Sequence, residues 1–291
     1  MSAFESSAVD GAESSASIFE LMEGNQLEAC KEKLASMSVE EINNNEMNGM
    51  YLVHVALISN NPEMLKEVLK YSVDVDKKEM NMGSTPLMIA IESEDSLALE
   101  FAQILIDAHA DVNIADNGNT TPLMKATGFG KTELVRLLIA NKADVTALKC
   151  GSRGPSALHF ALEYNFPEIV SMLLENGADV NVSDLYGRSP LMLGACFDAV
   201  GAVEELLKSK SVKINKQGDD GDEYGYGFTA LHFAVNQGAV GVTKLLIAHG
   251  IDITIKESSR DVTAVEMIDQ VDDDVVPAEV KEQLKALFID C

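Results

Sequence analysis

Five histidines are the side chains of this chain best suited to act as general acids, bases or metal ligands near neutral pH. His54, His159 and His232 stand in one slot of a six-residue phrase that recurs along the chain, whereas His109 and His249 each follow an apolar run. Catalysis needs a histidine beside a nucleophile, a carboxylate or further ligands, and no such motif accompanies these five. A recurring slot points instead to a role that the copies of the phrase share.

Carboxylates and cysteines also lack the spacing of a reactive site. The segment Asp219-Asp-Gly-Asp-Glu223 suggests calcium binding, because hard cations prefer clustered carboxylates. It lacks the ligand spacing and the distal Glu of a calcium loop, so a solvated acidic loop is expected. Gly225-Tyr-Gly227 is too short for a phosphate loop. The four cysteines show no metal or disulfide spacing, which is typical of a reducing compartment. We therefore expect no catalytic residue, metal or cofactor.

The recurring phrase predicts the elements that position these residues. Its copies begin at residues 51, 85, 121, 156, 189 and 229, with a weaker one at 263, so the steps are 34, 36, 35, 33, 40 and 34 residues. Clear copies are Thr85-Pro-Leu-Met-Ile-Ala90 and Thr229-Ala-Leu-His-Phe-Ala234. Each predicts a helix start, because Thr or Ser caps the first turn and Pro needs no donor there. An apolar run follows each copy, and Gly177 and Gly250 suit the left-handed turn after such a helix.

The phrase, its period and the Ala-Asp-Val-Asn turns at 110–113 and 178–181 resemble the ankyrin-repeat family. The resemblance covers about residues 47–291 and implies an all-α solenoid of stacked helix-turn-helix units with hairpin-like tips. We expect a disordered acidic tail over 1–16 and a single solenoid over 17–291. The solenoid would comprise an N-terminal cap 17–46, repeats 47–262 and a C-terminal capping repeat 263–291, about seven units after the cap. The resemblance also implies that the histidines of the phrase bond to turn backbone.

Composition limits the partners. The 291 residues include 47 acidic and 22 basic side chains, a formal net charge of −25. Nucleic acid is not expected as a partner, because clustered Lys and Arg are missing. The charge has two interpretations, solubility of a monomeric repeat protein or attraction of a basic partner. No window suits a membrane span, and the N-terminus resembles neither a secretory signal nor a transit peptide, so cytoplasm or nucleus is expected.

Aromatic side chains at one register position predict a binding surface. The resemblance implies that the eighth and ninth residues, counted from the capping Thr or Ser, face outward on the concave side, next to the groove. Three successive units place an aromatic at the ninth position, and further candidates lie in the tips before the caps. The predicted partner-binding residues are Phe129, Tyr164, Phe197, Arg153, Tyr186, Arg188, Asp219, Asp220, Asp222, Glu223, Tyr224, Tyr226 and Phe228. Aromatic residues and Arg are enriched in binding hot spots. Phe160 and Phe233 are expected to pack between units instead.

Copies of the phrase that lie more than 33 residues apart indicate insertions between them. About three extra residues around 93–98 are expected to lengthen the connection between two helices, and six extra residues make the finger 216–228 long and acidic. Insertions in repeat proteins often lie on the binding face.

The resemblance and the missing reactive motifs favour a non-catalytic protein–protein interaction module, acting as an adaptor, scaffold, or regulatory or inhibitory subunit. One alternative is an acidic escort chaperone for a basic client protein. A second alternative is an enzyme or enzyme subunit with an unrecognised site in a groove.

Overall fold

The computed structural model of the chain describes residues 16–149, 151, 154–219 and 227–289. The expected tail lies outside them apart from residue 16, as do the site candidates Arg153, Asp220, Asp222, Glu223, Tyr224 and Tyr226. The chain divides into two compact units, Met1–Val75 and Asp76–Cys291, here called unit 1 and unit 2. A single solenoid over 17–291, with the cap and repeat boundaries given above, stays a prediction.

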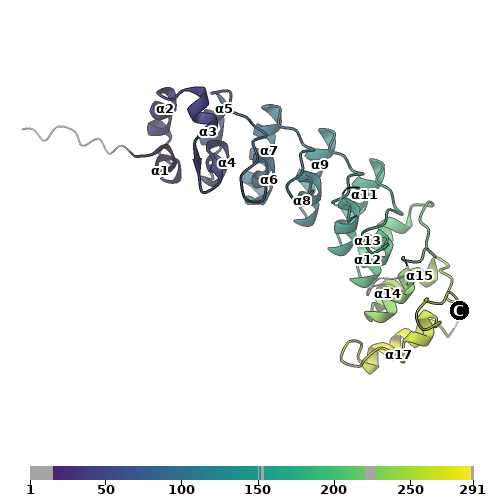
Figure 1. Cartoon of the computed structure of the whole chain (residues 1–291). Helices are drawn as coiled ribbons and strands as arrows, with labels where there is room; N and C mark the ends of the chain where they lie inside the picture. Colours follow the sequence, from purple (N-terminus) through teal and green to yellow (C-terminus); the bar gives the residue numbers. More distant parts are fainter. Residues whose placement is uncertain (1–15, 150, 152–153, 220–226, 290–291) are drawn as a thin grey trace, which may run out of the picture. The chain divides into compact units, whose positions relative to one another are not determined.

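Unit 1 combines five helices with a short hairpin (Figure 1). Its elements are α1 (Ile18–Glu23), α2 (Leu27–Ala35), α3 (Val39–Asn44), β1 (Glu46–Met47), β2 (Met50–Tyr51), α4 (Leu52–Ile58) and α5 (Pro62–Leu69). The hairpin is antiparallel, with Glu46 opposite Tyr51 and Met47 opposite Met50. Helix α1 packs on α2 and α4, and α5 packs on α2 and α4. Met22, Leu34, Leu52 and Met64 are fully buried in this core.

Unit 2 consists of six helix pairs. They are α6 (Pro86–Glu92) with α7 (Asp95–Asp107), α8 (Pro122–Gly128) with α9 (Thr132–Ala140), α10 (Ala157–Glu163) with α11 (Pro167–Glu175), α12 (Pro190–Cys196) with α13 (Val200–Leu207), α14 (Ala230–Asn236) with α15 (Val240–Ala248), and α16 (Ala264–Met267) with α17 (Ala278–Leu287). First helices stack on first helices and second on second along the series (Figure 1). Seventeen helices and one two-stranded hairpin form the regular structure of the described residues, which confirms the all-α repeat fold.

Capping explains why the first helices begin where they do. The hydroxyls of Thr85, Thr121 and Ser189 accept the backbone N–H three residues later, at 3.4, 3.2 and 3.4 Å. Proline occupies the first helical position after each of these caps, as the phrase predicts. Where the phrase carries a histidine, the capping hydroxyl also lies beside the ring: that of Ser156 is 3.0 Å from Nδ1 of His159, and that of Thr229 is 2.8 Å from Nδ1 of His232.

Asparagine side chains in the turns join neighbouring pairs of unit 2. Oδ1 of Asn181 accepts the N–H of Lys213 at 2.8 Å, while its Nδ2 donates to the carbonyl of Ser211 at 2.8 Å. Asn113 makes the same two bonds, to the N–H of Asp144 and the carbonyl of Lys142. Each bond satisfies a backbone group that the turn would otherwise leave to water.

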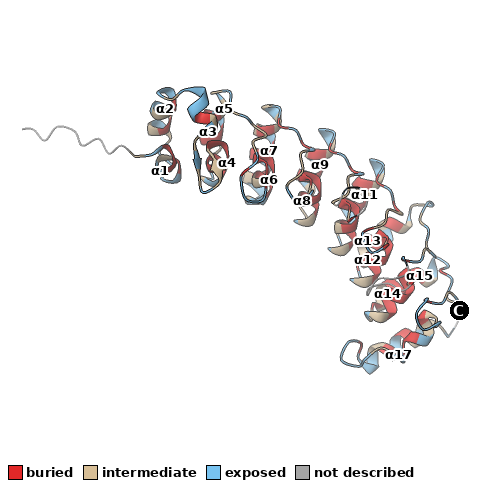
Figure 2. Cartoon of the chain, in the orientation of Figure 1, coloured by how far each residue is buried: buried red, intermediate tan, exposed pale blue. Residues whose placement is uncertain are grey.

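The recurring phrase accounts for much of the buried core of unit 2. Its Leu and Ala positions are buried, as in Leu158 and Ala161 of α10, and Figure 2 shows the buried faces turned toward neighbouring helices. In α12 the Ala position is taken by Gly194. A Cβ there would lie 2.6 Å from Val203 Cγ2 and 2.9 Å from Leu162 Cδ1, so the close approach requires glycine.

The expected longer connection around residues 93–98 is wrong. Only Ser93 and Glu94 separate α6 from α7, whereas three residues separate α8 from α9. The extra residues extend α7 to 13 residues, against 9 in α9. Ala98, Leu99 and Glu100 have high helix propensity, so helix rather than loop takes up the insertion.

Candidate protein-binding surface

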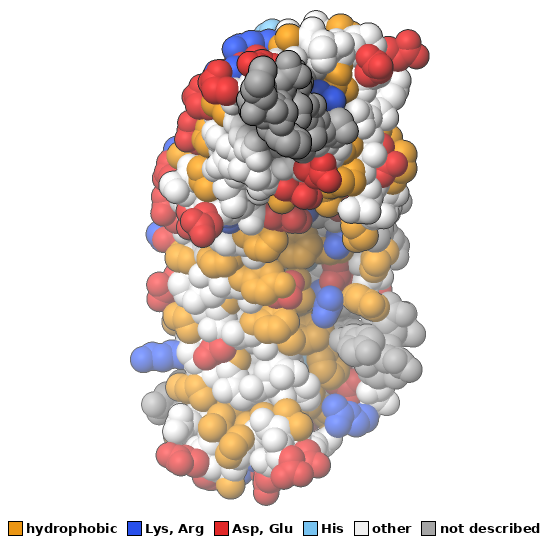
Figure 3. Space-filling view, turned by 90° about the vertical axis from the view of Figure 1, so that its left-hand side faces the viewer, with side chains coloured by type: hydrophobic (Ala, Val, Ile, Leu, Met, Phe, Trp, Pro, Cys, Tyr) orange, Lys and Arg blue, Asp and Glu red, His pale blue; other side chains and the backbone are white. Residues whose placement is uncertain are grey.

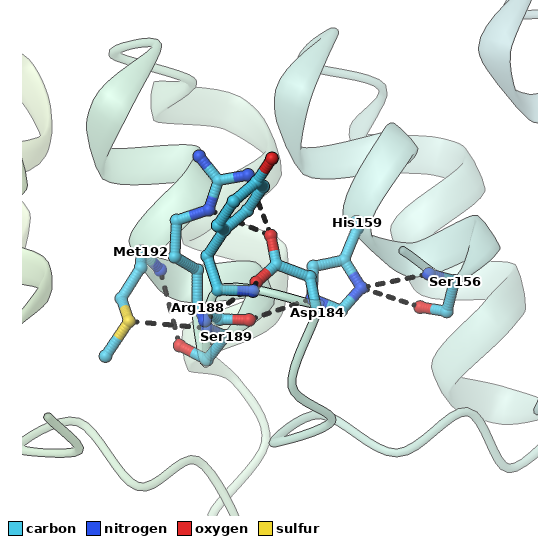
Figure 4. Close-up of polar contacts among 7 residues, drawn as sticks. Ser156, His159, Asp184, Arg188, Ser189 and Met192 are labelled. Carbon is cyan, nitrogen blue, oxygen red and sulfur yellow. Dashed lines mark hydrogen bonds and ion pairs between the residues drawn. The ribbon is translucent and has the colours of Figure 1, made fainter. Parts of the chain in front are cut away.

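The histidines of the phrase serve the scaffold. Nδ1 of His159 accepts the N–H of Ser156 at 3.1 Å, and Nε2 lies 3.1 Å from the carbonyl oxygen of Arg188 in the next tip (Figure 4). His232 repeats this with Thr229 and Val262. Burial lowers the pKa of His159 to about 4 and also lowers the pKa of His232. These imidazoles are neutral and enclosed, which confirms the structural role that the resemblance implies.

A buried carboxylate shapes the tip that carries Tyr186 and Arg188. Oδ1 of Asp184 accepts the backbone N–H groups of Tyr186 and Arg188, both at 2.9 Å. Oδ2 accepts Nε of Arg188 at 2.8 Å, and Nη2 of Arg188 lies 2.8 Å from the same oxygen (Figure 4). The guanidinium carbon stands 4.9 Å from the centre of the Tyr186 ring. The tip is thus fixed from within, with Tyr186 on its outside.

Three exposed rings follow the first helices of successive pairs. Phe129, Tyr164 and Phe197 each occupy the C-cap position, after α8, α10 and α12. Their exposed fractions are 55, 49 and 54%. The exposure agrees with the register argument, and the binding role of these rings stays a prediction.

The remaining described candidates lie around the long finger. The Phe228 ring is half-buried, with its centre 5.4 Å from those of His232 and Phe233. Asp219 is exposed and lies against the neighbouring tip, where a Cβ on Gly187 would meet its backbone nitrogen at 2.4 Å. The finger closes at its base, because Gly218 donates its N–H to the carbonyl of Phe228 at 2.9 Å.

A cleft of about 300 Å³ lies between α10, α12 and the Asp184 tip. We call it the α10–α12 cleft; it is lined by Phe160, Glu163, Leu185, Tyr186, Arg188 and Leu193, together with Lys149, Pro155 and Asp184. The sequence argument placed Phe160 between units, yet its ring is half-buried and lines this cleft. Leu193 and Leu185 were not among the predicted binding residues. Spacing could have found Leu193, because it precedes Phe197 by one helical turn, as Phe160 precedes Tyr164. Leu185 could have been found as the neighbour of Tyr186 in the tip.

Within the described ranges, no group of three or more His, Cys, Asp or Glu side chains is arranged to hold a metal ion. The same part of the chain contains no helix with the length and hydropathy needed to span a bilayer.

Family comparison agrees with this geometry. The family model described as ankyrin repeats (3 copies) matches residues 18–116, 96–184 and 182–257. The chain belongs to the ankyrin-repeat family. Ankyrin repeats are general protein–protein interaction modules, and members of the family are typically non-catalytic.

Relatives share the repeats with only moderate identity. Dog inversin is 27% identical over 233 residues, which cover 68% of this chain and 21% of that protein. The chicken nuclear factor NF-kappa-B p105 subunit is 26% identical over 239 residues, covering 79% of this chain and 23% of that protein. The chain therefore spans about a fifth of the length of these relatives. The ankyrin repeat domain of Bcl-3, a member of the IkappaB family, superposes with a TM-score of 0.63 at 23% identity, covering 82% of this chain and all of that domain. That likeness shows the fold.

Proposed function

We propose that the chain is a non-catalytic interaction module that binds a protein partner through the face carrying Phe129, Tyr164 and Phe197 and the tips beside it. The observation that supports this most is the exposure of about half of each ring at one position of three successive pairs. Rings of this kind bury a large area on binding and lose little conformational entropy. Such a module would act as an adaptor or scaffold, or as a regulatory or inhibitory subunit.

To test this, the full chain is immobilised on a support and incubated with a native cell extract. The proteins that it retains are cross-linked and identified by mass spectrometry. The comparison is a variant carrying Phe129→Ala, Tyr164→Ala and Phe197→Ala. We expect a specific set of proteins on the wild type and its loss on the variant, with the melting temperature unchanged. Equal retention by a folded variant would place binding elsewhere, and a lower melting temperature with equal retention would show that the rings stabilise the stack.

The net charge of −25 supports one further candidate, an acidic escort that shields a basic client. Attraction through a long-range field is screened as ionic strength rises, since the Debye length falls from about 10 Å at 0.1 M to about 3 Å at 1 M salt. An escort would therefore lose affinity steeply in a salt titration. Affinity that changes little over this range would favour the adaptor or regulatory role.

A further inference from the structure

The exposed rings of α10 and α12 continue an apolar surface that begins in the cleft. On α10, the N–H of Tyr164 donates to the carbonyl of Phe160 at 3.0 Å, and on α12 Phe197 donates to Leu193 at 3.1 Å. Residues four apart lie on the same helix face, so each ring stands one turn beyond a cleft-lining side chain. The tip adds Leu185 and Tyr186, with exposed fractions of 45 and 39%. We call these six residues the apolar strip.

The strip ends after two helix pairs. On α8 the two positions that correspond to Phe160 and Tyr164 hold Lys125 and Phe129. Lys125 forms an ion pair with Glu92. On α14 the same two positions hold Phe233 and Gln237, and the Phe233 ring is buried beside Phe228. In Figure 3, hydrophobic side chains likewise gather in a column with charged side chains mainly toward its edges. An apolar centre with a polar border is the usual anatomy of a protein interface.

One carboxylate on this surface, Glu163, lines the cleft beside Tyr164. In the part of the chain that the structure describes, the neighbouring ion pairs join other carboxylates, such as Glu92, Glu168 and Asp184. The charge of Glu163 raises the pKa of the Tyr164 phenol and contributes to the raised pKa of the Cys196 thiol, after burial. Lys149 lines the cleft from the preceding tip and would repel a cation placed next to it. A cation would therefore lie better beside Glu163 and the Tyr164 ring.

Building on the proposed function, we propose that the apolar strip holds a short segment of a partner protein in which a bulky apolar residue lies next to Lys or Arg. The apolar side chain fills the α10–α12 cleft, and the cation lies against Glu163 and the face of Tyr164. A second copy of this chain is disfavoured as occupant, because two molecules of charge −25 repel each other whereas a basic segment is attracted.

The probe is a displayed library of random 12-residue peptides, selected on the full wild-type chain. Enriched peptides are synthesised and measured against Tyr164→Ala, Phe197→Ala, Glu163→Gln and Phe129→Ala by fluorescence polarisation. Val275→Ala is the matched control, since Val275 is exposed to 55% but lies outside the strip. Melting temperatures are recorded for every variant.

We expect peptides that pair Leu, Met or Phe with Arg or Lys. Tyr164→Ala and Phe197→Ala should weaken them about 30-fold, as for hot-spot residues, and Glu163→Gln about 2- to 5-fold. Phe129→Ala should weaken them less than Tyr164→Ala or Phe197→Ala, because Phe129 belongs to the same face but lies outside the strip. Val275→Ala should have little effect. Enriched peptides without a basic residue, or affinities that depend on Phe129 and not on Phe197, would overturn the inference while leaving the proposed function standing. Dimers in sedimentation that Phe197→Ala dissociates would assign the strip to a second copy. If neither peptides nor extract proteins are retained, the proposed function fails as well.

Discussion

The imidazole of His159 ties the stability of unit 2 to pH. Burial lowers its pKa to about 4, from an ordinary value of 6.5, so the unfolded chain takes up a proton at a pH where the folded chain does not. The stability that the neutral ring contributes is complete above pH 6.5 and is lost as the pH falls from 6.5 to about 4. At pH 5 the loss is roughly 2 kcal/mol, and the lowered pKa of His232 acts in the same direction.

His159→Met tests this, because Met88, Met124 and Met192 fill the same slot in other pairs. The difference in unfolding free energy between pH 7 and pH 5, measured with urea, should shrink by roughly 2 kcal/mol in the variant. If this difference were the same in the variant and the wild type, groups other than His159 would cause the loss of stability at low pH.

A second residue-scale prediction concerns Thr127 in α8. Its side chain is fully buried, and its hydroxyl has no hydrogen-bond partner among the described residues. The same position holds Ile91, Leu162 and Val235 in other pairs. Thr127→Val keeps the shape and removes the unsatisfied hydroxyl, so the unfolding free energy should rise by about 1 kcal/mol. Thr127→Ser keeps the hydroxyl, loses a methyl group and should lower it. A loss of stability in the Val variant would reveal a partner for the hydroxyl.

At the scale of elements, the ends of the second helices offer a matched pair of substitutions. The left-handed position after α9 is Lys142, with φ 72°, and after α11 it is Gly177, with φ 93°. A side chain in this region costs about 1 kcal/mol or more. Lys142→Gly should therefore stabilise the protein by about 1 kcal/mol. Gly177→Ala should destabilise it by a similar amount through the backbone alone, because its Cβ would have no atom within 4 Å. Thermal or urea unfolding of both variants measures the effect, and shifts of the same sign would contradict it.

Elements set by local chemistry could be predicted from the sequence, and those set by packing could not. Thr121 and Pro122 determine the start of α8 with their own atoms, so the phrase located it. The count of residues between phrases showed that something was inserted near 93–98 but not which element would absorb it, and α7 did. Phe160 was misjudged for a related reason, since its surroundings depend on a tip about 25 residues further along the chain.

For unit 2 as a whole, stability should fall toward its C-terminal end. Helix pairs in a repeat protein gain stability from each neighbour, and among the described helices α17 packs mainly on α15, whereas α11 packs on α9, α10 and α13. Hydrogen exchange followed by mass spectrometry should therefore show faster exchange in α17 than in α11, which lies between α9 and α13. Equal rates in the two helices would mean that unit 2 opens as one cooperative block.

The hydrogen bond from Gly218 to Phe228 has a practical consequence for protein engineering. It joins the two ends of the finger beside the scaffold, where α12 packs directly on α14 and α13 on α15. We therefore expect the arrangement of these helix pairs to tolerate a longer chain between Gly218 and Phe228. Loop length changes closure entropy slowly, by about 0.6 kcal/mol for each doubling. A fluorescent peptide or an affinity epitope inserted after Asp219 should thus leave the helix pairs intact. The finger then becomes a reporter site next to the tip that carries Tyr186.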